Sequence, residues 1–331
     1  MSGPGARRGR AVKVESRYSP HHRRLRAAVE WITRSLGDAP LGCVIRHHGT
    51  TVGHEVCRGM TADILFEIGS IRKSFNSALI GCTSDRSDFT IHLKATNMWP
   101  ELAAISGDPG DTEITLHHLA SGVSGWMTPD PPGLRFLYNS AASTAAERVV
   151  GRYWGFPHDE IAAEIARRFK EPLDAASWKI YHFPGRFTPG DVENPGPKLA
   201  IDSDLADLAT WGELWCNSGR WRGQQLIPEA YVKRATSLVN PDIPSSHYGY
   251  GWFVNAGHAL WPRVPADSYG HAGFGSFRSS GEPSRAFLWV CPSLSVVAAI
   301  ITDASAGFAG DFLDVPNDFT AECITKIMSA L

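Results

Sequence analysis

The sequence predicts an α/β (α+β) protein in which one antiparallel sheet is assembled from both ends of the chain and is flanked by helices. Strand-like segments occur at residues 41–46 and 51–57 and return only after residue 248, whereas the chain between them has mostly helical or loop-like patterning. At 331 residues the chain is also longer than one hydrophobic core usually grows. We therefore expect a helical lobe inserted between the two halves of the sheet.

These patterns divide the chain into three parts. Residues 1–19 mix arginine, glycine and proline without an apolar period, which predicts a flexible basic tail. Residues 20–73 and 245–331 are expected to form the sheet lobe, and residues 74–244 a mainly helical lobe. Small-molecule sites usually lie in clefts between lobes, so we expect an active site at this junction.

Periodicity and helix-breaking residues predict the individual elements. An amphipathic helix is expected over residues 21–36, and the segment 37–40 ends it with glycine and proline. The first two strands are separated by a His48-Gly49 turn. The remaining expected elements are a strand-like segment at 64–69 leading into a helix at 74–80, helices at 141–153, 157–169 and 203–218, a loop at 189–197, strands at 286–290 and 294–302, and a closing helix at 318–331.

Composition is that of a soluble globular protein and gives no argument for nucleic-acid or membrane partners. The chain is 43% hydrophobic and 20% charged, with a net charge of -2. Its basic N-terminus is not followed by the apolar segment of an export signal, and no stretch is long enough to span a bilayer, so a native start here implies a cytoplasmic protein. The six cysteines are scattered without a Cys-x-x-Cys and are expected to be reduced thiols; no metal or cofactor is expected.

The most informative motif is Ser70-Ile71-Arg72-Lys73, which lies where a strand-like segment passes into a helix. Three residues apart on a helix, Lys73 is within reach of the Ser70 hydroxyl. A serine hydroxyl is a poor nucleophile unless a neighbouring group accepts its proton, and Ser-x-x-Lys supplies such a group locally. The motif therefore predicts a serine nucleophile with a lysine partner.

Two further motifs follow in order along the chain, Tyr138-Asn139-Ser140 and His271-Ala272-Gly273. With these three motifs the chain resembles the family of class C β-lactamases and penicillin-binding-protein-type D-alanyl-D-alanine peptidases, which carry Ser-x-x-Lys, Tyr-x-Asn and Lys/His-x-Gly. The resemblance covers roughly residues 22–325 and includes a Tyr248-Gly249-Tyr250-Gly251-Trp252 segment before the third motif. It implies the β-lactamase/transpeptidase-like fold and a serine hydrolase or acyltransferase activity.

The resemblance also implies a role for each site residue. Ser70 is the expected nucleophile, Lys73 takes or relays its proton, and Tyr138 is a second proton carrier that titrates together with Lys73 as a coupled pair. The backbone N–H groups of Ser70 and Phe274 are the expected oxyanion hole, and His271 holds Tyr138 or donates to a substrate carboxylate or carbonyl. The expected substrate-binding residues are Asn139, Ser140, Gly273, Trp126, Trp252 and Phe277.

Two departures from the family pattern bear on the substrate. The third position of Tyr-x-Asn is Ser140, and the nearest asparagine, Asn139, stands one residue earlier, where it can substitute only if the loop shifts. In the family this asparagine holds the amide side chain of a β-lactam or peptide. Residues 85–100 also differ from the family pattern and are expected to shape a different donor or acceptor pocket.

Four functions fit these observations. The first is a serine acyltransferase that moves an acyl group from an ester or thioester through acyl-Ser70 to an amine or alcohol, as do the family's biosynthetic transacylases for capuramycin-type antibiotics and statin side chains. The others are an esterase or amidase that uses water, a β-lactamase or D-alanyl-D-alanine peptidase, and a non-catalytic binding protein. The expected partners are small molecules, with neither nucleic acid nor membrane among them.

Overall fold

The computed structural model describes residues 27–28, 30–31, 34, 41–57, 60–157, 160–192, 196–304 and 318–330. The basic tail expected over residues 1–19 lies outside this part of the chain. Of the helix expected over residues 21–36, the described residues are helical.

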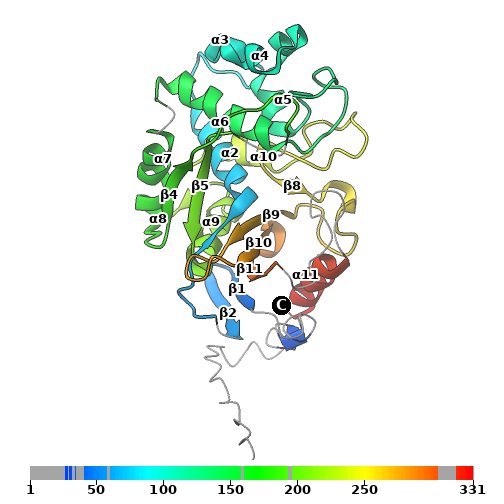
Figure 1. The fold of residues 1–331 in the computed structure, drawn as a ribbon. Helices are drawn as coiled ribbons and strands as arrows, with labels where there is room; N and C mark the ends of the chain where they lie inside the picture. Colours follow the sequence, from blue (N-terminus) through cyan, green and yellow to red (C-terminus); the bar gives the residue numbers. More distant parts are fainter. Residues whose placement is uncertain are drawn as a thin grey trace, which may run out of the picture.

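A six-stranded antiparallel sheet is built from both ends of the chain (Figure 1). In order across the sheet its strands are β2 (Thr50–Cys57), β1 (Leu41–His47), β11 (Val296–Asp303), β10 (Pro283–Cys291), β9 (Tyr269–Ser276) and β8 (Phe253–Val254). The two chain ends meet in the β1–β11 pair, where Leu41 lies opposite Thr302. The predicted sheet from both chain ends is confirmed.

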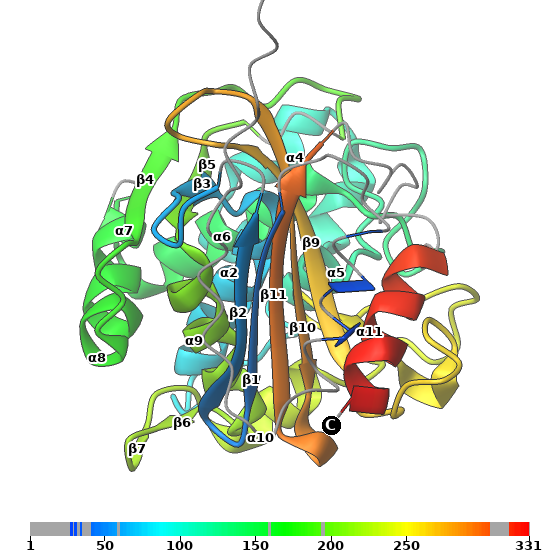
Figure 2. The same ribbon diagram turned by 90° about the horizontal axis from the view of Figure 1, so that it is seen from below.

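Packed side chains cover both faces of this sheet, so β1 and β11 are apolar along most of their length. Side chains alternate between the faces: Val44 joins the core that contains α2 (Arg72–Thr83) and α9 (Leu205–Cys216), and Cys43 joins the core beneath α11 (Asp318–Ala330). Seen from below, α11 lies on one side of the strands and α2 and α9 on the other (Figure 2).

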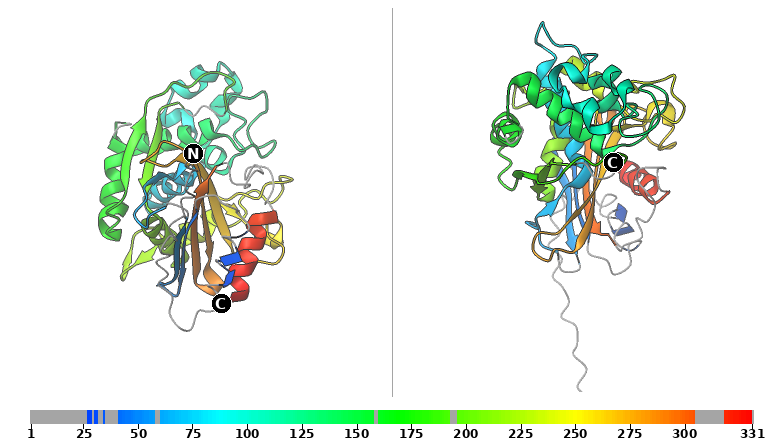
Figure 3. Two further views of the ribbon diagram at one scale, coloured as in Figure 1. Left: turned by 60° about the horizontal axis from the view of Figure 1, so that its bottom comes forward. Right: turned by 45° about the horizontal axis from the view of Figure 1, so that its top comes forward.

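The chain between the two halves of the sheet forms most of the helices. They are α3 (Ala95–Met98), α4 (Glu101–Ser106), α5 (Leu116–Ser121), α6 (Ser140–Trp154), α7 (Glu160–Ile165), α8 (Glu171–Leu173), α9 and α10 (Glu229–Ala235), with short 3-10 turns at Pro109–Glu113 and Ala256–His258. Both views in Figure 3 show the cyan and green helices gathered at one end of the molecule, with the red helix α11 against the sheet.

A second sheet joins one strand from the strand-like segment expected at residues 64–69 to two strands that lie in the segment predicted to be helix and loop. Its strands pair in the order β3 (Phe66–Glu67), β5 (Lys198–Ser203) and β4 (Lys179–Phe183), and a separate hairpin joins β6 (Arg220–Trp221) to β7 (Gln224–Gln225). The expectation was wrong here because these strands are short and β3 finds its partner far along the chain. Local pattern does not reveal such pairings.

Two predicted boundaries also differ. The helix expected at residues 157–169 continues beyond α7 as a π-helix at Ala166–Lys170 and then as α8. The strand expected at residues 294–302 begins at Val296, because Pro292–Leu294 forms a 3-10 turn and Ser295 takes the left-handed conformation, with φ 51°. The predicted closing helix is confirmed as α11.

The cysteines form no disulfide among the residues whose side chains are described, which leave out Cys57. The free cysteines are Cys43, Cys82, Cys216, Cys291 and Cys323. No helix in the described part of the chain combines the length and apolar composition needed to cross a bilayer.

Candidate active site

Ser70 lies in a short connection between the second sheet and helix α2. Strand β3 ends at Glu67, a 3-10 turn spans Gly69–Ile71, and α2 begins at Arg72. The Ile68 N–H donates to the carbonyl of Ile201 on β5, which ties the start of this turn to the second sheet. Ser70 is partly exposed, whereas its neighbours Gly69 and Ile71 are buried. The fold therefore presents this serine at the surface from a buried, supported turn.

Two glycines allow strand β9 to approach this turn. Gly69 has φ +54°, and a Cβ added there would lie 2.5 Å from the Phe274 nitrogen. A Cβ added at Gly273 would lie 1.8 Å from the Ile68 carbonyl oxygen and 3.1 Å from the Ser70 nitrogen. Side chains at these positions would push the two segments apart. The backbone nitrogens of Ser70 and Phe274 therefore both lie in the region where the turn meets β9, and Gly273 serves that close approach.

Lys73 projects from the first turn of α2 toward Ser70. Its Nζ lies 2.9 Å from the Ser70 Oγ and 3.4 Å from the Ser140 Oγ. The side chain is 4% exposed. Burial, followed by the neighbouring charges of Arg72 and Lys198, holds the pKa of Lys73 well below its usual range. A deprotonated Lys73 is an amine that can accept the Ser70 proton.

Tyr138 ends the loop that leads into helix α6, and Lys73 Nζ lies 4.5 Å from the centre of its ring. Its hydroxyl is buried and has no hydrogen-bond partner of ordinary geometry among the described residues. Burial raises the pKa of Tyr138, although nearby Ser70 and Arg72 oppose the shift. Tyr138 is therefore a neutral phenol beside Ser70 and Lys73, with a proton that it can donate.

Asn139 and Ser140 have exchanged the positions that the family pattern suggests. The Asn139 Oδ1 accepts from the Ala142 N–H at 2.8 Å as the N-cap of α6, and its Nδ2 donates to the Trp126 carbonyl at 2.8 Å. Both ends of the amide are thus used within the fold, so the expectation that Asn139 holds substrate does not fit this structure. Ser140, the next residue, presents its hydroxyl to Lys73.

His271 contacts a different tyrosine from the one expected. It is 1% exposed on β9, with Nδ1 2.6 Å from the Ala272 carbonyl oxygen and Nε2 3.0 Å from the Tyr248 hydroxyl. Burial, together with the charge of Lys73, lowers the pKa of His271 to about 3. A neutral His271 donates from Nδ1–H to Ala272 and accepts from Tyr248. Its expected contact with Tyr138 is limited to ring packing, with centroids 6.0 Å apart.

Tyr248 is the residue of this site that the sequence analysis did not assign a role. Its hydroxyl donates to His271, and its ring meets the Tyr138 ring edge-on at a centroid distance of 6.0 Å. The available signal was the Tyr248-Gly249-Tyr250-Gly251-Trp252 segment, which marked a strand but not a contact. Tyr248 therefore links strand β9 to Tyr138 through its ring and hydroxyl.

The aromatic residues expected to wall the pocket are mostly core residues. Trp126 is fully buried and donates from its indole nitrogen to the Leu102 carbonyl. Trp252 is also fully buried, where its ring packs against those of Trp215 and Tyr269. Phe277 is 5% exposed. Large aromatic rings stabilise most by full burial, so these positions do not fit the expectation that they face substrate.

A narrow cavity of mixed polar and apolar lining includes Lys73 and Tyr138 in its wall. Its walls include Lys73, Asn76, Tyr138, Asn139, Tyr248 and Tyr250. Residues 85–100, expected to shape a donor or acceptor pocket, do not line it; they pack against α5, where the Leu116 N–H donates to the Leu93 carbonyl. Part of that stretch lines a separate surface groove beside α10.

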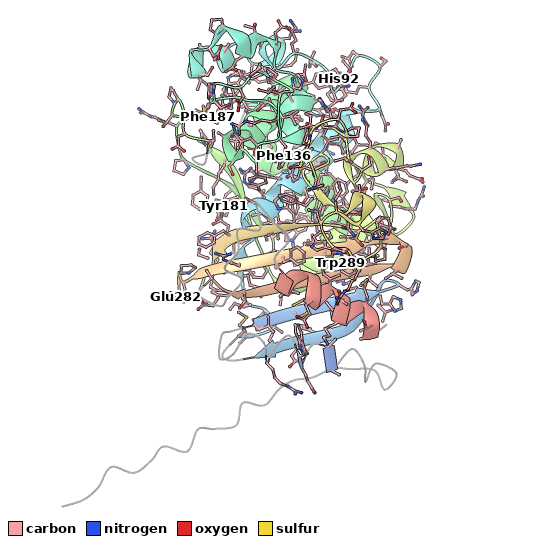
Figure 4. The ribbon with its side chains drawn as sticks, turned by 90° about the vertical axis from the view of Figure 1, so that its right-hand side faces the viewer. His92, Phe136, Tyr181, Phe187, Glu282 and Trp289 are labelled. Atoms are coloured by element: carbon pink, nitrogen blue, oxygen red, sulfur yellow. The ribbon has the colours of Figure 1, made fainter. Side chains whose placement is uncertain are left out.

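Several labelled side chains lie near the place where the helices meet the sheet. Figure 4 shows Phe136 and Tyr181 in this zone, above the strands, with Glu282 at the tip of the β9–β10 hairpin and Trp289 within the sheet layer. The Phe274 side chain is exposed, and the guanidinium of Arg285, its partner on β10, lies 5.8 Å from the centre of its ring.

Comparison with known proteins identifies one family and one fold. The model of a family described as Beta-lactamase matches residues 39–318. A penicillin-binding protein homologue from Caulobacter crescentus superposes with a TM-score of 0.74 at 15% identity, covering 97% of this chain and 100% of that one. A putative β-lactamase from Bacteroides dorei DSM 17855 gives 0.69 at 15% identity, with 93% and 97% covered. A family VIII carboxylesterase gives 0.69 at 14% identity, with 97% and 100% covered.

Proposed function

Because this chain belongs to the β-lactamase family of serine hydrolases, we propose that it forms an acyl ester on Ser70 and passes the acyl group to another molecule. The proposed donor is an ester or thioester, and the proposed acceptor is an amine or alcohol of natural-product biosynthesis. The observation that carries the proposal is the 2.9 Å contact between Ser70 Oγ and the buried Lys73 Nζ. That contact joins a nucleophile to a group able to take its proton.

Acylation follows from this geometry. The Ser70 Oγ attacks the donor carbonyl carbon while its proton passes to Lys73 Nζ. The backbone N–H groups of Ser70 and Phe274 stabilise the tetrahedral oxyanion, a contribution typically of about 2.7–4 kcal/mol per donor. The intermediate collapses as the bond to the leaving group breaks. Tyr138, a buried neutral phenol beside Ser70 and Lys73, protonates the leaving group and regains its proton from Lys73.

Deacylation reverses these transfers. An amine or alcohol acceptor attacks the acyl-Ser70 carbonyl and gives up its proton through Tyr138 to Lys73. Ser70 leaves as the C–O bond breaks and recovers its proton from Lys73. Water entering in place of the acceptor gives hydrolysis by the same steps, so the alternative of an esterase or amidase uses the same residues.

Two features favour an ester or thioester over a β-lactam or a peptide. His271, which stands where the family often has a lysine, is neutral and bonded to Tyr248, so it offers no positive charge to a substrate carboxylate. Asn139 spends its amide on the N-cap of α6 and on Trp126, which leaves no free amide at the Tyr-x-Asn position. One structure with the same fold is named as a family VIII carboxylesterase.

Intact-protein mass spectrometry tests the proposal. Wild type and Ser70→Ala are exposed in parallel to a fluorophosphonate and to a panel of esters, thioesters and β-lactams. We expect a mass gain in wild type only, and the donor that labels identifies the acyl class. The acyl-enzyme is then offered amines and alcohols in water. Product that appears only as free acid, whatever the acceptor, replaces the transferase with the hydrolase, and no adduct on wild type favours a binding protein.

A further inference from the structure

A second basic side chain is buried directly beside Lys73. Arg72 precedes Lys73 in the first turn of α2 and is 3% exposed. Its guanidinium donates to the Thr144 hydroxyl at 3.0 Å and lies 3.5 Å from a carboxylate oxygen of Glu147, whose side chain is fully buried. An arginine guanidinium keeps its positive charge inside proteins. The site therefore contains a permanent buried cation next to the lysine.

Glu147 is divided between several partners. Besides Arg72, it meets the His182 ring nitrogen at 3.2 Å and accepts from the Leu199 N–H at 3.4 Å. These contacts join helix α6 to strands β4 and β5. The carboxylate thus anchors Arg72, and it makes no ion pair with Lys73 among the described residues.

Lys73 itself faces no carboxylate. None of the ion pairs among the described residues includes it. The hydroxyls of Ser70 and Ser140 are its hydrogen-bond partners. The titratable groups around it are Tyr138 from the loop before α6, Tyr248 from the segment before β8, His271 from β9 and Lys198 from β5. A buried ammonium in neutral or positive surroundings releases its proton.

We propose that Arg72 is a positioning residue whose fixed charge keeps Lys73 in the amine form that accepts the Ser70 proton, with Glu147 holding Arg72 in place. This rests on the proposed acyl transfer through Ser70. The Ser-x-x-Lys pattern does not itself require this charge, because Arg72 occupies one of its two variable positions. The lowered pKa of Lys73 agrees with it: burial is the largest cause and Arg72 the next.

The direction of the effect follows from the charge. Without the Arg72 charge the ammonium form of Lys73 is less disfavoured, so its pKa rises. For two charges within one turn of a helix, partly offset by a carboxylate, we expect a rise of about one pH unit. At a pH below the wild-type midpoint, the rate of Ser70 acylation then falls about tenfold, and raising the pH above the new midpoint restores it.

The first test observes Lys73 directly. Protein labelled with carbon-13 at the lysine ε position is titrated by NMR, and the Lys73 signal is assigned by its loss in Lys73→Met. We expect a wild-type midpoint well below the usual value of about 10.4, and a midpoint about one unit higher in Arg72→Met. A wild-type midpoint in the usual range overturns the proposal without any variant, as does an unchanged midpoint in Arg72→Met.

Two variants serve as controls. Lys198→Gln removes the other nearby cation, which is partly exposed and contacts Glu67 at 3.7 Å. The Lys73 midpoint should therefore shift less in Lys198→Gln than in Arg72→Met. An equal or larger shift overturns the assignment to Arg72. Glu147→Gln removes the anion and should move the Lys73 midpoint downward. This variant tests the proposal even if Arg72→Met fails to fold. An upward shift in Glu147→Gln contradicts the proposal.

The second test measures the rate of fluorophosphonate labelling of Ser70 across pH. Arg72→Met should shift the midpoint upward and Arg72→Lys, which retains a charge, should restore it. A purely structural role for Arg72 predicts instead a lower rate at every pH with the same midpoint, and that result overturns the proposal. Wild type that is not labelled at any pH refutes the proposed function, whereas the NMR titration still decides the role of Arg72.

Discussion

Replacing Asn139 separates a folding role from a substrate-binding role at the Tyr138-Asn139-Ser140 motif. The side chain is 6% exposed and makes two hydrogen bonds of 2.8 Å, one as the N-cap of α6 and one to the Trp126 carbonyl. In Asn139→Ala, loss of the cap costs about 1 kcal/mol. The buried Trp126 carbonyl, left without its donor, costs about 1–3 kcal/mol more. We therefore expect the unfolding free energy to fall by about 2–4 kcal/mol.

A matched variant divides the two contributions. Asn139→Ser keeps a hydroxyl that can cap α6 but cannot reach Trp126, so it should recover about 1 kcal/mol relative to Asn139→Ala. Urea denaturation followed by far-ultraviolet circular dichroism measures both variants, and ester turnover is measured in parallel under conditions where each is folded. The reasoning is refuted if both variants unfold like wild type while KM rises, because the amide would then act on the substrate and not on the fold.

Three further predictions follow from the site. Ser70→Ala should abolish acylation with unchanged folding, measured by intact-protein mass and thermal unfolding; an adduct that persists excludes Ser70 as the nucleophile. Ser140→Ala, which removes the hydroxyl 3.4 Å from Lys73 Nζ, should lower turnover by about 10-fold to 100-fold, and a normal rate removes Ser140 from the proton path. His271, with its pKa lowered to about 3, is neutral in the folded protein and binds a proton more readily in the unfolded protein. Its contribution to the free energy of unfolding is therefore complete above about pH 6.5 and is lost as pH falls toward 3. At pH 5 that loss amounts to about 2 kcal/mol. Urea denaturation at pH 5 and 7.5 should show that the free energy of unfolding of His271→Gln depends less on pH than that of wild type. An equal pH dependence contradicts the assignment.

The sequence predicts best what depends on nearby residues. Ser70 and Lys73 are three positions apart at the start of α2, so local helical geometry alone brings their side chains within 2.9 Å. The long apolar runs of β1 and β11 similarly predict central strands, because a strand covered on both faces carries no alternation. Such features need no knowledge of which distant segments meet.

The parts that the sequence did not predict depend on contacts between distant segments or on the residue at which a helix begins. Asn139 and Ser140 are adjacent, and only the start of α6 decides that the amide caps the helix while the serine faces Lys73. Tyr248 meets His271 through a side-chain hydrogen bond to a residue 23 positions later on β9. Tryptophans such as Trp126 and Trp252 can line a pocket, but their large rings are equally suited to the core in which they lie.

The substitutions at this site remove polar contacts to a substrate without removing the groups that move protons. The lysine position of the third motif carries a neutral histidine whose two ring nitrogens are occupied by Ala272 and Tyr248. Ser70, Lys73 and Tyr138 stay together, with the Lys73 Nζ 2.9 Å from the Ser70 Oγ and 4.5 Å from the centre of the Tyr138 ring. These observations support the proposal of an ester or thioester donor in place of a peptide or a β-lactam.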